Sequence, residues 1–168
     1  MIDETLVLGE ERDRLDARLD ELVSRLQDAN PDTASADVLQ HEANDLDVQG
    51  RGVSHLIDEY GRDATVTVAG LSAGDFARVE DRAATMRSQH PGPGNLPGSS
   101  RNVFAAAVLV EAPFYTGDKT DLDAKISAVA AQPIGVVKWL ESKGNDLTSV
   151  DSGNWTSFAE RVATGRTG

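Results

Sequence analysis

Apolar residues recur with a helical period through the first third of the chain, with charged residues between them. Five leucines spaced by 7, 4, 3 and 4 residues form the first stripe, namely Leu8, Leu15, Leu19, Leu22 and Leu26, and Arg12 fills its missing position. A second stripe of similar spacing contains Leu39, Ala43, Leu46, Val53, Ile57 and Tyr60. The two runs predict an antiparallel helical hairpin over residues 1–60.

Proline and glycine set the expected ends of these two helices. Asn30-Pro31-Asp32 ends the first helix, because proline disfavours helix in the residue before it. Gly50-Arg51-Gly52 is expected to break or kink the second helix.

From Gly61 the hydrophobic period changes from about 3.6 residues to about two. Thr65–Ala69 alternates and predicts a strand, and residues 72–89 predict a helix with an apolar face. Residues 90–100 contain three prolines and three glycines, so they predict a long loop without regular structure. Residues 103–112 form the most apolar run of the chain. This run fits a buried strand or a buried helix, and its three consecutive alanines favour helix slightly.

The last third of the chain predicts three short helices. Thr120 and Asp123 form a capping pattern at the start of a helix that reaches Ala131. Pro133 opens a second helix that ends at Gly144-Asn145 and turns Val136, Val137, Leu140 and Trp139 inward. Residues 155–163 predict the third helix. The expected fold is therefore mainly α, of the α+β class: a helical hairpin at 1–60, then a small strand-plus-helices domain at 61–168.

The charge balance narrows the classes of partner. The 168 residues carry a net charge of −12, with 18 Asp and 10 Glu against 12 Arg and 4 Lys. The negative electrostatic potential of such a chain repels phosphate backbones, and the sequence contains no basic patch. We therefore expect no nucleic-acid partner. No apolar run approaches the ~18 residues that a membrane span requires, so we expect no membrane partner. The acids and the shortage of lysine are typical of haloarchaeal proteins, whose carboxylates keep the surface hydrated in molar salt. The alternative is an acidic protein from an ordinary cell, where the same charge also favours solubility.

Residues 70–74, Gly-Leu-Ser-Ala-Gly, match the G-x-S-x-G pattern of a serine-hydrolase nucleophile elbow. Such a serine requires a histidine base and an orienting acid, in the order Ser, acid, His. His90 is the one histidine that follows, and a single predicted helix separates it from Ser72. Ser72 and Asp75 also form the S-x-x-D pattern of a capping box, which requires no triad. We therefore predict a helix cap at Ser72 and no catalytic residue.

Other candidate sites are weak. His41 and His55 lie fourteen residues apart on one predicted helix, too far to share a metal ion. Asp118, Asp121 and Asp123 lack the order of a calcium loop, so they are interpreted as favourable acids at a helix start. Gly92, Gly94 and Gly98 miss the G-x-G-x-x-G spacing, and no phosphate-binding P-loop occurs. We expect no metal site and no cofactor.

The leucine stripe has two interpretations that the sequence leaves open. The stripe packs entirely within the chain, or its remaining edge docks a neighbouring protein. In the second interpretation the partner interface contains Leu8, Leu15, Leu19, Leu22 and Leu26.

Three short segments within residues 60–82 and 101–149 match a known pattern. Residues 71–76, Leu-Ser-Ala-Gly-Asp-Phe, fit L-[ST]-x-G-[DE]-[FY] after a strand. Residues 104–110 fit an apolar run rich in alanine and valine, and residues 145–148, Asn-Asp-Leu-Thr, fit a closing N-x-L-[ST]. Together they resemble the tail assembly chaperones of tailed double-stranded DNA viruses. The leucine-rich hairpin and the Pro/Gly-rich segment depart from that pattern.

This resemblance implies a non-enzymatic role in tail assembly in the host cytoplasm, where such a protein coats the tape-measure protein until tail-tube subunits replace it. The alternative is a permanent virion component, such as a head–tail connector or tail protein, that forms a homo-oligomer through its hairpin. The expected partners are other viral proteins in both cases.

Overall fold

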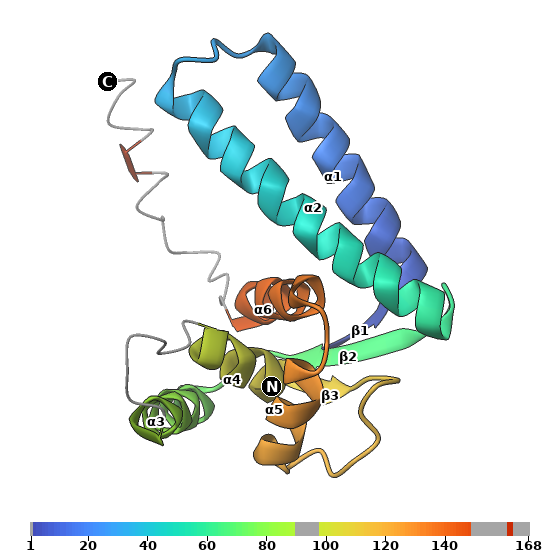
Figure 1. Cartoon of the computed structure of the whole chain (residues 1–168), viewed down its shortest axis with the longest axis vertical. Coiled ribbons are helices and arrows are strands. Elements are labelled where there is room, and N and C mark those ends of the chain that lie inside the picture. Colours follow the sequence, from blue (N-terminus) through green and yellow to red (C-terminus); the bar gives the residue numbers. More distant parts are fainter. Residues whose placement is uncertain (1, 90–97, 149–160, 163–168) are drawn as a thin grey trace.

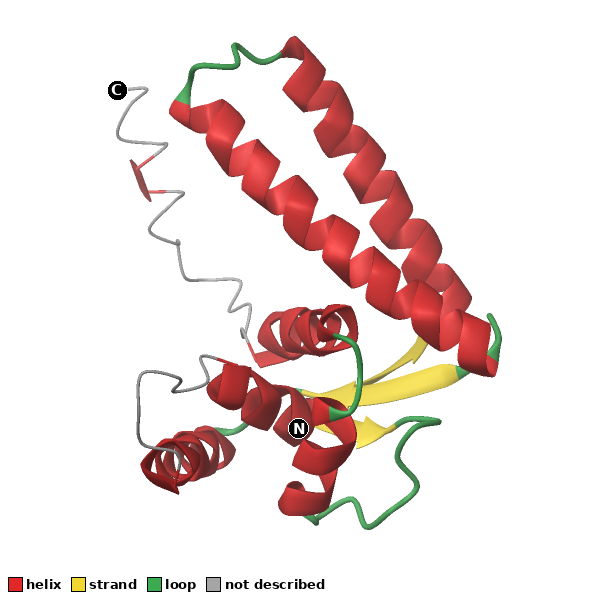
Figure 2. Ribbon diagram, viewed as in Figure 1, coloured by secondary structure: helices red, strands yellow, loops and turns green. Residues whose placement is uncertain are grey.

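The structure, a computed structural model, describes residues 2–89, 98–148 and 161–162. Its helices and strands in chain order are β1 (Asp3–Val7), α1 (Leu8–Asp28), α2 (Ala34–Tyr60), β2 (Thr65–Ala69), α3 (Ala73–Gln89), α4 (Gly98–Val108), β3 (Leu109–Glu111), α5 (Leu122–Ala130) and α6 (Ile134–Thr148). Helices dominate, and one small antiparallel sheet accompanies them (Figure 2). The expected mainly helical fold, with an N-terminal helical pair before a strand-plus-helices region, is confirmed.

The helical pair projects away from the rest of the protein (Figure 1). Helix α1 ends just before Pro31, as predicted, and α2 begins where the Thr33 hydroxyl accepts a hydrogen bond from the Ala36 amide at 3.3 Å. The pair meets the body at one end, where α2 crosses α6.

Helix α2 runs without interruption through Gly50-Arg51-Gly52, so the predicted break is wrong. The glycine at position 52 serves packing instead. A Cβ atom there would lie 2.2 Å from the carbonyl carbon of Gly135 in α6, a distance that no real side chain tolerates. The backbones of α2 and α6 therefore approach each other at a pair of glycines, Gly52 and Gly135. Glycine within a helix costs only about 1 kcal/mol relative to alanine, so α2 remains helical there.

The sheet has the order β1-β2-β3, with both neighbouring pairs antiparallel. Strand β2 lies where the alternating pattern predicted it, at residues 65–69. Strand β1 was not predicted, and it pairs with β2 in the register Asp3 to Ala69 and Val7 to Thr65. The division of the chain at residue 60 stays a prediction, and this strand pairing joins the two sides of that division.

Helix α3 confirms the helix predicted after the strand. The apolar run at 103–112 is helix in its first part and strand in its second, because α4 ends at Val108 and β3 begins at Leu109. Residues 98–100 belong to α4, so the predicted loop extends too far, and its residues 90–97 lie outside the described part.

Two details of the last helices correct the sequence analysis. Asp121, and not Thr120, caps α5, because its carboxylate accepts a hydrogen bond from the Ala124 amide at 3.0 Å. Helix α6 continues past Gly144-Asn145 to Thr148, because Gly144 packs against the side chain of Val108 and does not end the helix. The helix predicted at 155–163 falls, apart from residues 161–162, outside the described residues.

Helix α6 occupies the centre of the molecule. It packs against α2 on one side and against α4 and β2 on the other (Figure 1). The four apolar residues predicted to turn inward are all buried, and Trp139 is fully enclosed. Through α6 the hairpin and the body share one hydrophobic core.

Candidate functional site

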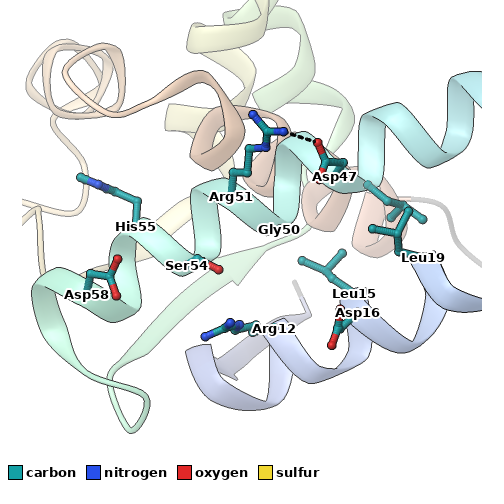
Figure 3. Close-up of a pocket in the computed structure, with 11 residues that line it drawn as sticks. Arg12, Leu15, Asp16, Leu19, Asp47, Gly50, Arg51, Ser54, His55 and Asp58 are labelled. Carbon is teal, nitrogen blue, oxygen red and sulfur yellow. Dashed lines mark ion pairs between the residues drawn. The ribbon is translucent and has the colours of Figure 1, made fainter.

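A groove of about 390 Å³ runs between α1 and α2 at the base of the hairpin (Figure 3). Leu15, Leu19 and Leu46 supply its apolar part. Its polar lining residues, which come from both helices, are Arg12, Asp16, Asp47, Arg51, Ser54, His55 and Asp58. An apolar strip between charged edges is the arrangement that an amphipathic helix of a partner fits.

The charged edges of the groove are accessible to solvent. The Arg51 guanidinium pairs with Asp47 at 3.0 Å, and both side chains are about half exposed or more. Because an exposed pair of this kind contributes little to stability, a partner can replace it at low cost. Figure 3 shows the His55 ring pointing out of the groove, so Ser54, His55 and Asp58 do not form a hydrogen-bonded triad.

The five leucines predicted as a partner interface divide into two groups. Leu8, Leu15 and Leu22 are buried inside the chain, with exposed fractions of 0 to 3%. Leu19 and Leu26 are half-buried, so the accessible part of the stripe lies along these two. Val23 follows Leu19 by four residues, lies on the same side of α1 and is 42% exposed. The use of the stripe by a partner stays a prediction, and these three residues are its reachable part.

The base of the hairpin carries a buried polar cluster around Glu11 that the sequence analysis missed. Its Oε2 atom accepts hydrogen bonds at 3.0 Å from the Trp139 indole nitrogen, from Lys143 Nζ and from Arg14 Nη2. Arg12, which was expected to fill the stripe, is exposed at the groove instead. The spacing contained a signal, because Glu11 lies three residues after Leu8 and four before Leu15.

The environment of Glu11 holds it in its charged form. Burial alone raises the pKa of a carboxyl group, and here the hydrogen bonds from Arg14, Trp139 and Lys143 outweigh that effect. The pKa of Glu11 is therefore lowered from its ordinary value. Glu11 thus fixes the first turn of α1 to α6, and the groove begins one residue later at Arg12.

Ser72 forms the predicted cap at the start of α3. Its hydroxyl accepts a hydrogen bond from the Asp75 amide at 3.1 Å, and the Asp75 carboxylate accepts from the Ser72 amide at 3.2 Å. The hydroxyl also donates to Asp75 Oδ2 at 2.7 Å. These contacts lower the pKa of Asp75. Among the residues that the structure describes, those that line the surface around Ser72 include no histidine, and His90 lies outside the described part.

The remaining candidate ligands serve local structure. Asp118 accepts two hydrogen bonds from Thr120, and Asp123 pairs with Arg82 at 2.8 Å. His41 and His55 both lie on α2, as predicted. Within residues 2–89, 98–148 and 161–162, no three His, Asp or Glu side chains gather as metal ligands. Over the same ranges no helix has the length and apolarity needed to cross a membrane.

Comparisons of the chain with protein-family models, with curated proteins and with solved structures gave no match.

Proposed function

We propose that this protein has a non-enzymatic role in the assembly of a viral tail, in which its hairpin holds a helical segment of a tape-measure-like protein. The observation that carries the proposal is the groove on the projecting hairpin, whose apolar part lies beside exposed charges. The resemblance of residues 71–76, 104–110 and 145–148 to tail assembly chaperones supplies the biological setting.

The apolar part of the surface has the shape of a helix-binding strip. The half-buried Leu19 and Leu46 line the groove above the buried Leu15, and Val23 extends the accessible apolar surface toward the tip of the hairpin. Side chains of a partner helix spaced by three and four residues would cover these positions. Because the strip is short and partly covered, its contacts would be weak and reversible, as a chaperone requires.

Charge selects the kind of segment that binds. Residues 8–60 contain fourteen Asp and Glu but five Arg and no Lys. Complementary potentials speed association and exclude partners of like charge. We therefore expect the bound segment to be an amphipathic helix with lysine or arginine beside its apolar face.

The test first asks whether a long helical protein is encoded beside this gene, as the proposal expects, and then co-expresses that protein with this chain in a haloarchaeal host. The proposal expects the partner to stay soluble and to co-purify with this chain. Val23→Arg should reduce co-purification at least tenfold, because it places a cation in the apolar strip. Val38→Arg is the matched control, because Val38 is 65% exposed and lies on the face of α2 that carries Asp45, away from the groove.

Three results would contradict the proposal. These are the lack of any such neighbouring gene, a partner whose solubility does not depend on this chain, and an equal effect of the two valine variants. The protein composition of purified virus particles distinguishes a chaperone from a permanent virion component. A chaperone is missing from them, whereas a virion component that oligomerises through its hairpin is present in a symmetric copy number.

A further inference from the structure

A second pocket, of about 460 Å³, lies on the body of the protein and shares no lining residue with the hairpin groove. Residues from the sheet and from helices α3, α4 and α5 line it. Its apolar lining is formed by Ala69, Leu71, Val79, Ala107, Leu109, Val110 and Leu122. Its volume falls within the range of pockets that bind small molecules.

Lys125 of α5 lines this pocket and is only 7% exposed. Its Nζ atom donates a hydrogen bond to the Leu109 carbonyl oxygen at 2.6 Å. An ammonium group has three N–H donors, so this contact leaves two of them available. Among the residues that the structure describes, no carboxylate lies within ion-pair distance of Lys125. The cation is therefore enclosed without a counter-ion, which is an unusual state for a lysine.

The electrostatic setting agrees with that geometry. Burial lowers the pKa of Lys125, and the attraction of Asp118 only partly opposes this effect. Four other charged residues line the pocket, namely Asp3, Asp75, Arg78 and Lys119. Arg78 is 3.6 Å from Asp75, Lys119 pairs with Glu111, and Asp3 is exposed. Two of the four lysines of this acidic chain thus line one pocket.

We propose that this pocket binds a small apolar monocarboxylate, with its hydrocarbon part against the apolar lining and its carboxylate on Lys125. Binding would supply the counter-ion that Lys125 lacks and would use its remaining donors in charge-assisted hydrogen bonds. The apolar lining would exclude water from the ion pair and strengthen it. This site is independent of the hairpin groove and of the proposed role in tail assembly.

The first test compares three ligands of one chain length on the full chain. Octanoate, octanol and octylammonium are titrated by calorimetry at one constant KCl concentration, because chloride competes for the ammonium group. We expect octanoate to bind at least tenfold more tightly than octanol and octylammonium to bind most weakly. Equal affinities for octanoate and octanol would overturn the proposal without any variant.

The second test uses variants to show whether octanoate binds in this pocket. Lys125→Met keeps the length of the side chain but removes its charge, so octanoate binding should fall at least tenfold while octanol binding is retained. Ala107→Phe fills the pocket and should weaken both ligands. Lys138→Met is the matched control, because Lys138 pairs with Asp45 on another surface and does not line the pocket. Unchanged octanoate binding in either pocket variant, or an equal loss in the Lys138 variant, would overturn the assignment.

Discussion

The indole nitrogen of Trp139 donates a 3.0 Å hydrogen bond to the carboxylate of Glu11, which lies 128 positions earlier in the chain. Lys143, one helical turn further along α6, reaches the same Oε2 atom at 3.0 Å. The carboxylate is almost fully enclosed, as are both donors. This contact joins the first turn of the hairpin to the central helix, so it sets where the hairpin meets the body.

Replacement of Glu11 by glutamine should destabilise the protein by about 3 kcal/mol. The amide is nearly isosteric, but it leaves the buried ammonium group of Lys143 without a counter-ion. Chemical denaturation at constant salt measures the change in the free energy of unfolding. Glu10→Gln is the control, because Glu10 is exposed and its loss should cost less than about 0.5 kcal/mol.

The double variant Glu11→Leu/Lys143→Met separates the charge from the packing. Replacing both members of a buried pair by apolar residues often costs less than removing one member. We expect the double variant to be more stable than either single variant. A double variant whose loss equals the sum of the two single losses would show that the two groups do not act as a pair.

Stability should also depend on pH through Glu11. Because its pKa is lowered in the folded protein, the unfolded chain binds more protons between the two pKa values. The contribution of Glu11 is therefore complete above the ordinary pKa of about 4.5 and is lost as the pH falls through the folded value. Asp75 acts in the same direction. Denaturation between pH 3 and 6, roughly the span over which carboxylates titrate, should show a smaller slope for Glu11→Gln than for the wild type.

The glycine pair at the helix crossing gives a sharper test. Gly52→Ala would place a Cβ atom 2.2 Å from the carbonyl carbon of Gly135, so α2 and α6 must separate. We expect a loss of more than about 3 kcal/mol, at the upper end of overpacking effects. Gly50→Ala in the same helix is the matched control, because nothing lies within 4 Å of its added Cβ. Alanine is the better helix former, so this control should stabilise the protein by up to about 1 kcal/mol. Equal thermal shifts for the two variants would contradict the close crossing.

Ser72→Ala tests the cap at the start of α3. Loss of the hydroxyl leaves the Asp75 amide without its acceptor and should cost about 1 kcal/mol. Ser24→Ala is the control, because Ser24 is exposed within α1. Hydrolysis of p-nitrophenyl esters in high salt is the second measurement. Ester turnover that Ser72→Ala abolishes would show that the serine is a nucleophile, contrary to this interpretation.

The parts of the fold that the sequence predicted depend on neighbouring residues. The stripes of α1 and α2, the alternation of β2 and the Ser72–Asp75 cap all involve groups within a few positions of one another. The geometry of these features follows from the helical and strand periods, so it can be predicted from the sequence alone. The same reasoning named all five leucines of the α1 stripe as a partner interface, so it did not separate the half-buried Leu19 and Leu26 from the three that are buried. It also did not find the charged lining of the groove.

Contacts between distant residues decided the rest. Strand β1 requires β2 as a partner, and the change from α4 to β3 at Leu109 requires the edge of that sheet. From the sequence alone, Gly52 is interpreted as a helix breaker and Glu11 as a surface acid. In the structure Gly135 packs against Gly52, and Trp139 and Lys143 enclose the carboxylate of Glu11. Local periodicity determined that α1, α2 and α3 are helices and that β2 is a strand. The tertiary structure alone decided which glycines and charges are buried, because burial depends on what packs against a residue and not on its neighbours in the chain.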